Sequence, residues 1–114
     1  MAEDEAESIV IEVEQSATAA TVIVRGEIDL ESSAALVDAF AGLGQPEAVH
    51  LDLGDVEYMD STGLRAVLAA RAELESRGAR LDVVRASSIV ARLFEITGLA
   101  DMVSEPPVGD SPAG

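Results

Sequence analysis

The chain has 114 residues, a formal net charge of −15 at pH 7 and no cysteine. An acidic surface of this size repels nucleic-acid phosphates and anionic membranes, so the sequence argues against both as direct partners and favours a protein partner. The lack of cysteine excludes a disulfide framework and a thiolate nucleophile. No apolar run approaches the roughly 20 residues of a membrane span, and the acidic first residues are unlike a secretion signal, which predicts a cytoplasmic protein.

The length predicts a single folded domain. Composition divides the chain into an acidic tail at residues 1–7, a folded domain at 8–104, and a tail rich in proline and glycine at 105–114. We expect the first tail to be disordered and the last to be flexible. Aromatic residues make up only 3% of the sequence, so the core must be built mainly from Val, Leu, Ile and Ala.

The hydrophobic pattern alternates between the two-residue period of strands and the wider spacing of helices. It predicts, in order, strands at 9–14 and 21–25, a helix with Leu36, Phe40 and Leu43 inward, a strand at 49–53, a helix at 61–76, a strand at 81–84, a helix with Ile89, Val90, Leu93 and Phe94 inward, and a short edge strand at 102–103. Ser32 or Ser33 could cap the first of these helices. We expect Gly26 to end the second strand. The first two strands form an antiparallel hairpin, whereas strands separated by helices are joined by parallel crossovers. The predicted fold class is α/β, with a mixed sheet of four or five strands and helices packed against it.

The start of the 61–76 helix carries several polar side chains. Asp60 stands at the N-cap position, and the hydroxyls of Ser61 and Thr62 fall in the first turn. A helix start has free N–H groups and is electropositive, so the domain would tolerate a phosphate there. Capping alone also explains the Asp-Ser-Thr sequence, because such residues commonly precede helices.

Residues suited to catalysis or metal binding are scarce. His50 is the only histidine, and with no cysteine in the chain it cannot readily complete a metal site or activate a serine. We therefore interpret it as a strand residue and expect no catalytic residue, metal or cofactor. Asp29 is suited to accepting backbone N–H groups in a turn.

Three segments resemble motifs of STAS domains, specifically the bacterial anti-sigma factor antagonists. The sequence Tyr58–Leu64 resembles the phosphorylation-site motif, the Gly-Glu-Ile-Asp sequence at 26–29 resembles an early element of the family, and Gly98-Leu99 after Leu93-Phe94 resembles a late one. They occur in order over roughly residues 8–104. The chain departs from the family pattern at Arg65, where glycine is common, and in lacking an additional C-terminal helix.

The resemblance implies an anti-sigma factor antagonist and not an enzyme. In that family the unmodified antagonist binds an anti-sigma factor that is also a serine kinase. This binding releases the sigma factor. The kinase then phosphorylates the serine after the motif aspartate, here Ser61, and a phosphatase resets the protein. The implied partner-binding residues are Asp29, Asp60, Ser61, Thr62, Gly63 and Arg65. We expect a monomer or a weak dimer.

Two other functions were weighed against this one. A STAS subunit of a lipid-transport or stress-signalling complex would share the same motifs, so it stays open. A two-component receiver domain superficially fits the length, the acidity and the sequence Leu51–Asp55. Receivers need an active-site lysine, however, and the chain contains no lysine.

Overall fold

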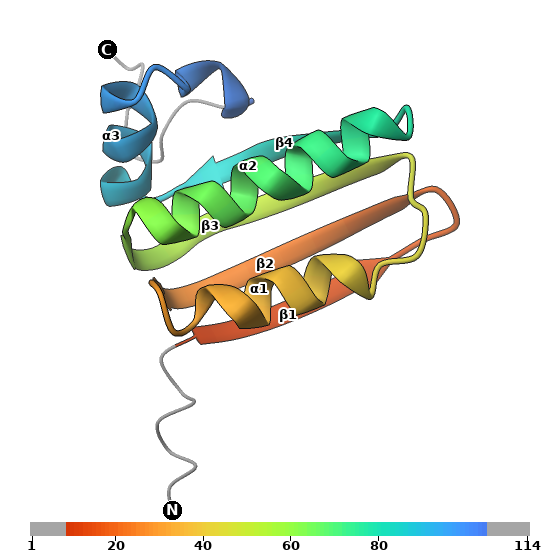
Figure 1. Cartoon of the computed structure of the whole chain (residues 1–114), viewed down its shortest axis with the longest axis horizontal. Coiled ribbons are helices and arrows are strands. Elements are labelled where there is room, and N and C mark those ends of the chain that lie inside the picture. The colour runs from red at the N-terminus through yellow and green to blue at the C-terminus, as the bar shows by residue number, and fades with distance from the viewer. Residues whose placement is uncertain (1–8, 105–114) are drawn as a thin grey trace, which may run out of the picture.

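Strands and helices alternate along residues 9–104, which are the residues that the computed structural model describes (Figure 1). In chain order the elements are β1 (Ile9–Gln15), β2 (Ala19–Ile28), α1 (Ser33–Ala41), β3 (Ala48–Met59), α2 (Ser61–Ser76), β4 (Arg80–Ala86), α3 (Ser88–Ile96) and the 3-10 helix η2 (Ala100–Met102). The two predicted tails, at 1–7 and 105–114, lie outside the described residues.

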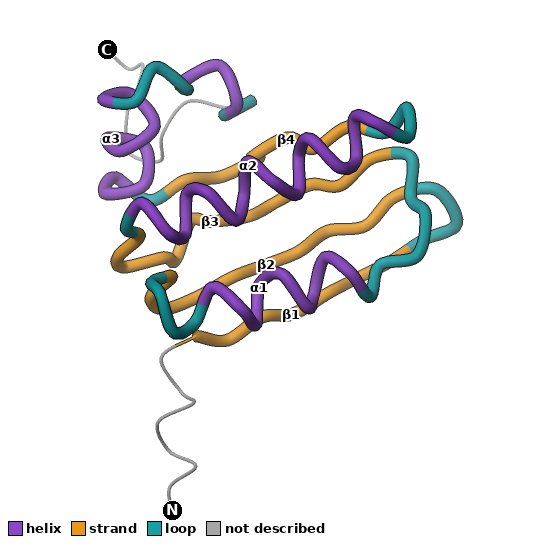
Figure 2. Tube along the Cα trace, in the orientation of Figure 1, coloured by secondary structure: helices purple, strands orange, loops and turns teal. Residues whose placement is uncertain are grey.

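The four strands form one mixed sheet in the order β1-β2-β3-β4 (Figure 2). β1 pairs antiparallel with β2, and β2, β3 and β4 are parallel to one another. The predicted α/β class and mixed sheet are therefore confirmed. The predicted edge strand at 102–103 is wrong: Met102 is the last residue of η2, and Val103 forms an isolated bridge with Val83.

Two strands run further than their sequences suggested. We expected Gly26 to end β2, but the strand continues to Ile28, with Gly26 at a φ of 102° beside a shift of register. β3 likewise extends past Leu53 to Met59. These extensions pair with each other, with Ile28 opposite Met59. Pairing between the two strands therefore outweighs the tendency of glycine and charged residues to end a strand.

The core lies between the sheet and the helices, with α1 over β1 and β2 and α2 over β3 and β4 (Figure 1). As expected it is mainly aliphatic. Its fully buried side chains are Val22, Val24, Ile28, Leu36, Val49, Leu51, Leu53, Val56, Val67, Val83, Val90 and Phe94. In α3, Val90 and Phe94 face inward as predicted, but Ile89 is 49% exposed, so its assignment to the core is wrong. Leu93, also predicted to face inward, is partly buried and packs against the core.

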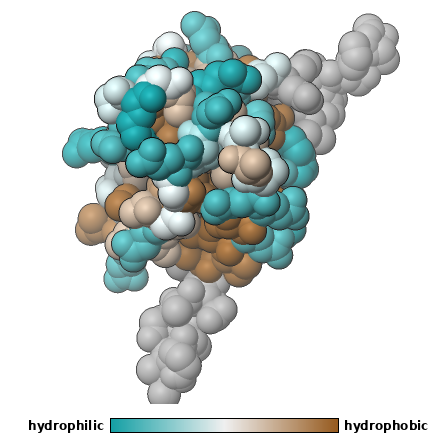
Figure 3. All heavy atoms as spheres, turned by 90° about the vertical axis from the view of Figure 1, so that its right-hand side faces the viewer, coloured by the Kyte–Doolittle hydropathy of each residue, from teal (hydrophilic) through white to brown (hydrophobic). Residues whose placement is uncertain are grey.

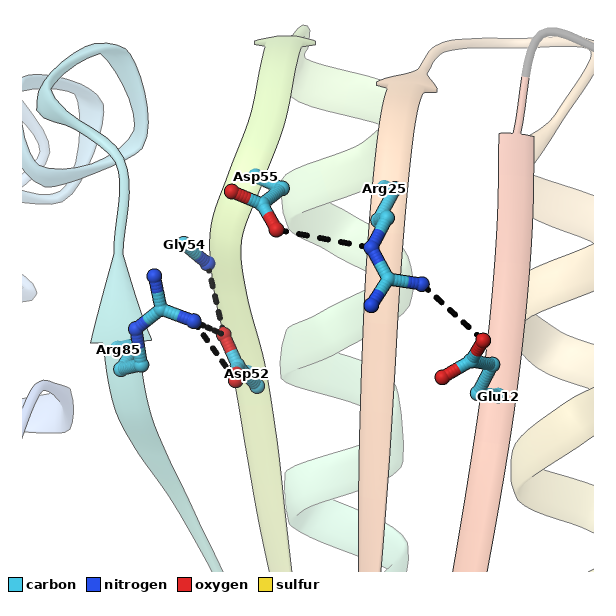
Figure 4. Close-up of polar contacts among 6 residues, drawn as sticks. All are labelled: Glu12, Arg25, Asp52, Gly54, Asp55 and Arg85. Atoms are coloured by element: carbon cyan, nitrogen blue, oxygen red, sulfur yellow. Dashed lines mark hydrogen bonds and ion pairs between the residues drawn. The ribbon is translucent and has the colours of Figure 1, made fainter.

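The opposite face of the sheet carries charged side chains that pair across the strands (Figure 4). Arg25 lies between Glu12 and Asp55, at 3.2 and 3.6 Å, and Arg85 lies 3.2 Å from Asp52. These pairs are partly exposed, and each contributes roughly 0–1 kcal/mol to stability. Both arginines of this group are thus paired with carboxylates of the same face.

The end of the molecule where β3 begins is covered largely by hydrophilic side chains (Figure 3). Hydrophobic atoms gather in the lower half of that view, at the height of α1 and β1. Val10 and Val13 on β1 and Val37 on α1 are exposed. Within the described part of the chain, no helix is both long enough and apolar enough to span a membrane.

Candidate functional site

The candidate site lies at the edge of the sheet where β2 and β3 end. Because the two strands are parallel and Ile28 pairs with Met59, the loops that follow them leave from the same edge. A hydrogen bond of 3.2 Å from the Asp60 N–H to the Ile28 carbonyl ties the start of α2 directly to the end of β2. The sheet therefore brings together the segment after Ile28 and the segment after Met59.

Asp60 caps α2. Its backbone is extended, with φ −105° and ψ −173°, while its Oδ1 accepts hydrogen bonds from the N–H groups of Thr62, at 2.9 Å, and Gly63, at 3.0 Å. Its carbonyl accepts the first bond within the helix, from Leu64 N–H at 3.0 Å. Asp60 is thus an N-cap residue, in agreement with the sequence, and such caps stabilise a helix by roughly 1 kcal/mol.

Gly63 lets the first turn of α2 approach the end of β2. A Cβ atom at this position would stand 2.6 Å from Ile28 Cγ2 and 2.7 Å from the Ile28 carbonyl oxygen. Such distances are too short for any real side chain. Gly63 is also buried, so it can contribute to the predicted partner-binding surface only by positioning the residues beside it.

Ser61 is the first residue of α2 and is exposed to solvent. Its hydroxyl forms no hydrogen bond within residues 9–104, whereas the neighbouring Thr62 is half-buried. A protein that modified this turn would therefore reach the Ser61 hydroxyl more easily than that of Thr62.

Asp29 organises the loop between β2 and α1. Its Oδ1 accepts hydrogen bonds from the N–H groups of Ser32, at 3.0 Å, and Glu31, at 3.1 Å. The Ser32 hydroxyl lies 3.0 Å from the same oxygen, donates to the Glu27 carbonyl at 2.7 Å, and accepts from the Asp29 N–H at 2.9 Å. The bond from the Ser32 N–H, followed by that from its hydroxyl, lowers the pKa of Asp29 below its ordinary value of 3.8.

The Asp29 network confirms one expectation from the sequence and overturns another. The predicted turn role of Asp29 is confirmed, because the bonds from Glu31 and Ser32 are local. We expected Ser32 or Ser33 to cap α1 through its side chain, but Ser32 stands at the N-cap position without such a bond. Its hydroxyl serves the loop instead.

Arg65 follows Ser61 by one helical turn and is exposed. Within the described residues it forms no ion pair, whereas the guanidinium groups of Arg25, Arg71, Arg80 and Arg85 each lie within 4 Å of a carboxylate. Arg65 is therefore free to pair with an anionic group that approaches this edge.

Three exposed apolar side chains lie on the segments that meet at this edge. Leu30, just after β2, is 73% exposed, Tyr58, near the end of β3, is 48% exposed, and Ile89, just after β4, is 49% exposed. None of the three is among the site residues expected from the sequence. Tyr58 is the first residue of the Tyr58–Leu64 motif and Leu30 follows Asp29 directly, so a search for large apolar residues beside Asp29 and Asp60 would have found them.

Ser61 lies outside two grooves of the described surface. One groove of about 390 Å³ lies between α1 and α2, near Phe40 and Arg77, and another of about 720 Å³ lies on the open face of the sheet, near Arg25 and Gly54. Neither is lined by Ser61. An exposed edge with apolar side chains among charged ones is suited to a protein partner.

The histidine of this chain lies far from Ser61. His50 and Met59 are separated by nine residues along β3, or about 30 Å at the rise of an extended strand. His50 therefore cannot act as a general base for Ser61. Among residues 9–104 there is also no group of three or more His, Cys, Asp or Glu side chains placed to hold a metal ion.

Comparison with known proteins agrees with this arrangement. The family described as "Mlab, STAS domain" matches residues 11–104. The chain belongs to the STAS domain family. An anti-sigma-B factor antagonist of Bacillus subtilis is 34% identical over 97 residues, which cover 84% of this chain and 89% of that protein. One of Listeria monocytogenes is 37% identical over 84 residues, covering 72% of this chain and 74% of that protein.

Solved structures share the fold of this STAS domain. The crystal structure of an anti-sigma factor antagonist from Mycobacterium paratuberculosis has a TM-score of 0.75 and 30% identity, covering 90% of this chain and 86% of that one. The anti-sigma factor antagonist SpoIIAA in its unphosphorylated form has a TM-score of 0.70 at 21% identity, covering 91% and 92% of the two chains. The family that the sequence resembled is thus confirmed.

Proposed function

We propose that this STAS domain is an anti-sigma factor antagonist and that it binds an anti-sigma factor through the edge of the sheet around Ser61. The observation that carries the proposal is an exposed Ser61 hydroxyl at the capped start of α2, with no hydrogen bond to any residue of 9–104. It occurs in a chain 34% identical to a protein named as an anti-sigma-B factor antagonist. The chain acts as a ligand and as a substrate for modification, and not as an enzyme.

The proposed interface combines apolar contacts with charges. Leu30 and Tyr58 supply large exposed side chains that can enter pockets of the partner, as the anchors of protein interfaces commonly do. Arg65 supplies a cation, and the Asp29 Oδ2 offers a carboxylate oxygen, since the bonds within the loop use Oδ1. The remaining proposed contacts, Asp60, Thr62 and Gly63, hold the backbone of this turn in place.

Phosphorylation of Ser61 by a serine kinase is the proposed switch. A phosphoserine adds about −1.5 to −2 charge and three acceptor oxygens. At a closely packed interface the phosphate loses water without gaining partners, which costs several kcal/mol, while 1.4 kcal/mol already weakens affinity tenfold. The modified antagonist then dissociates, and a phosphatase restores the binding form.

The experiment that tests this function begins in the native cell. Affinity purification of the tagged chain, followed by mass spectrometry, should recover an anti-sigma factor with an ATP-binding kinase domain. The purified pair, incubated with ATP, should give one phosphate on Ser61 and lose affinity at least tenfold. A Thr62→Ala variant is the matched control and should be phosphorylated like the wild type. Recovery of no such kinase, or labelling that persists in Ser61→Ala, would contradict the proposal.

A second candidate within the same family is a STAS subunit of a lipid-transport or stress-signalling complex. The matched family description includes "Mlab" beside "STAS domain". The same purification separates the two functions. Recovery of transporter subunits, or of a large assembly of STAS proteins, would favour the second candidate over the first.

A further inference from the structure

The start of α2 has little capacity left to stabilise a phosphate on Ser61. A helix start leaves four N–H groups without helical partners. Here the Asp60 N–H donates to Ile28, and those of Thr62 and Gly63 donate to the Asp60 carboxylate. Only the Ser61 N–H remains without a partner among the described residues. The Asp60 carboxylate, which accepts two of the other N–H groups, is negatively charged and would repel a phosphate.

Further carboxylates add to this repulsion. Asp29 directly follows the end of β2, and Asp60 directly follows the end of β3; these two strand ends pair with each other. Glu31 lies in the same loop as Asp29. The low pKa of Asp29 keeps its carboxylate ionised at neutral pH. A doubly charged phosphate on Ser61 would therefore lie among fixed negative charges unless a cation reached it.

Arg65 is the cation placed to reach it. Residues four apart on a helix lie on the same face, with Cβ atoms about 6 Å from each other, and an anion that precedes a cation in this spacing is the favourable order. Both Ser61 and Arg65 are exposed, and Arg65 has no ion pair within residues 9–104. A guanidinium group can also bind phosphate oxygens through two parallel N–H groups.

We propose that Arg65 binds the phosphate of phosphorylated Ser61 within the same helix. This inference rests on the proposed phosphorylation of Ser61 and adds a step to the switch. In the unmodified protein the Arg65 guanidinium is available to an acidic group of the partner. In the modified protein the phosphate occupies it, so one modification both introduces a charge at the interface and withdraws a cation from it.

The test uses phosphoserine incorporated at position 61 during translation, so that no kinase is needed. The melting temperature is measured with serine and with phosphoserine in the wild type, in Arg65→Gln and in Arg65→Lys. Phosphorylation should lower the melting temperature of Arg65→Gln by about 2–4 °C more than that of the wild type. Arg65→Lys, which keeps the charge without the paired N–H groups, should fall between them.

Arg77→Gln is the matched control, because Arg77 is an exposed arginine at the other end of α2, about 24 Å from Ser61 at the rise of an α-helix. Its response to phosphorylation should equal that of the wild type. As a second readout, 31P NMR titration should give the phosphate a lower pKa in the wild type than in Arg65→Gln. Equal thermal responses and equal titrations in the two proteins would overturn the inference.

The same proteins separate this inference from the proposed function. If phosphoserine at position 61 leaves partner binding intact, the proposed switch is wrong whatever Arg65 does. If phosphoserine abolishes binding but Arg65→Gln changes neither the melting temperature nor the titration, the switch stands and the role of Arg65 is overturned.

Discussion

Gly63 and Ile28 lie so close that no side chain fits between them: a Cβ on Gly63 would stand 2.6 Å from Ile28 Cγ2. This contact fixes the first turn of α2 against the end of β2. The position of Ser61 relative to the loop of Asp29 depends on it, because the turn and the loop leave from the two strands it joins.

The first prediction concerns this contact. Gly63→Ala should lower the free energy of unfolding by about 1–3 kcal/mol, because the added methyl group must displace the backbone of Ile28 or of α2. Urea titration measures the change. Gly42→Ala is the control: its φ is −83° and its Cβ would make ordinary contacts of 3.6 Å or more, so its stability should stay within about 0.5 kcal/mol of the wild type. Similar losses in the two variants would show that the contact is not tight.

The second prediction separates binding from folding at Ser61. Ser61 is exposed, and its hydroxyl forms no hydrogen bond within the described chain. The free energies of unfolding of Ser61→Ala and Ser61→Asp should therefore lie within about 0.5 kcal/mol of that of the wild type. Ser61→Ala should bind the anti-sigma factor whether or not kinase and ATP are present. Ser61→Asp should bind at least tenfold more weakly, as calorimetric titration would show. Wild-type affinity in Ser61→Asp would contradict a switch based on charge alone.

The third prediction concerns pH. The folded protein lowers the pKa of Asp29, chiefly through the N–H and hydroxyl of Ser32, so folding favours the ionised carboxylate. The stabilisation is fully present above the unfolded pKa of about 3.8 and is lost as the pH falls through the lower folded value. Asp29→Asn removes this dependence. The difference in unfolding free energy between wild type and Asp29→Asn should therefore shrink as the pH falls below 3.8. A difference that stays constant down to pH 2 would contradict it.

The fourth prediction concerns the apolar side chains of the proposed interface. Leu30→Ala and Tyr58→Ala should each weaken binding of the anti-sigma factor by about five- to thirtyfold, the usual range for anchors worth 1–2 kcal/mol. Their stability should change little, since both side chains are largely exposed. Val13→Ala, at an exposed apolar position on β1, is the control and should bind like the wild type. If Val13→Ala weakens binding and the other two do not, the interface lies on the β1 side of the domain.

Much of this architecture was predictable because it follows from local chemistry. Asp60 caps α2 as its sequence context indicated, and Gly78, in the left-handed conformation with φ 84°, follows the end of that helix. The mixed sheet followed from the order of strand and helix patterns alone.

The errors arose where distant segments decide the structure. Nothing near Gly26 signals that β2 continues to Ile28, because that extension depends on pairing with β3. The exposure of Ile89 depends on how little of α3 the sheet can cover. The loop network of Asp29 and Ser32 was only half predictable, because the Ser32 hydroxyl could equally have capped α1.

The cap formed by Asp60 also bears on how selectively this turn responds to signals. A helix start with free N–H groups attracts any dissolved phosphate or sulfate. Here a built-in carboxylate already holds the N–H groups of Thr62 and Gly63, and its charge repels dissolved anions. The turn should therefore bind inorganic phosphate weakly, whatever its concentration in the cell. Under the proposed switch, only a phosphate attached covalently to Ser61 would stay beside Asp60 despite the repulsion, so the turn would respond to the kinase and not to the concentration of a metabolite.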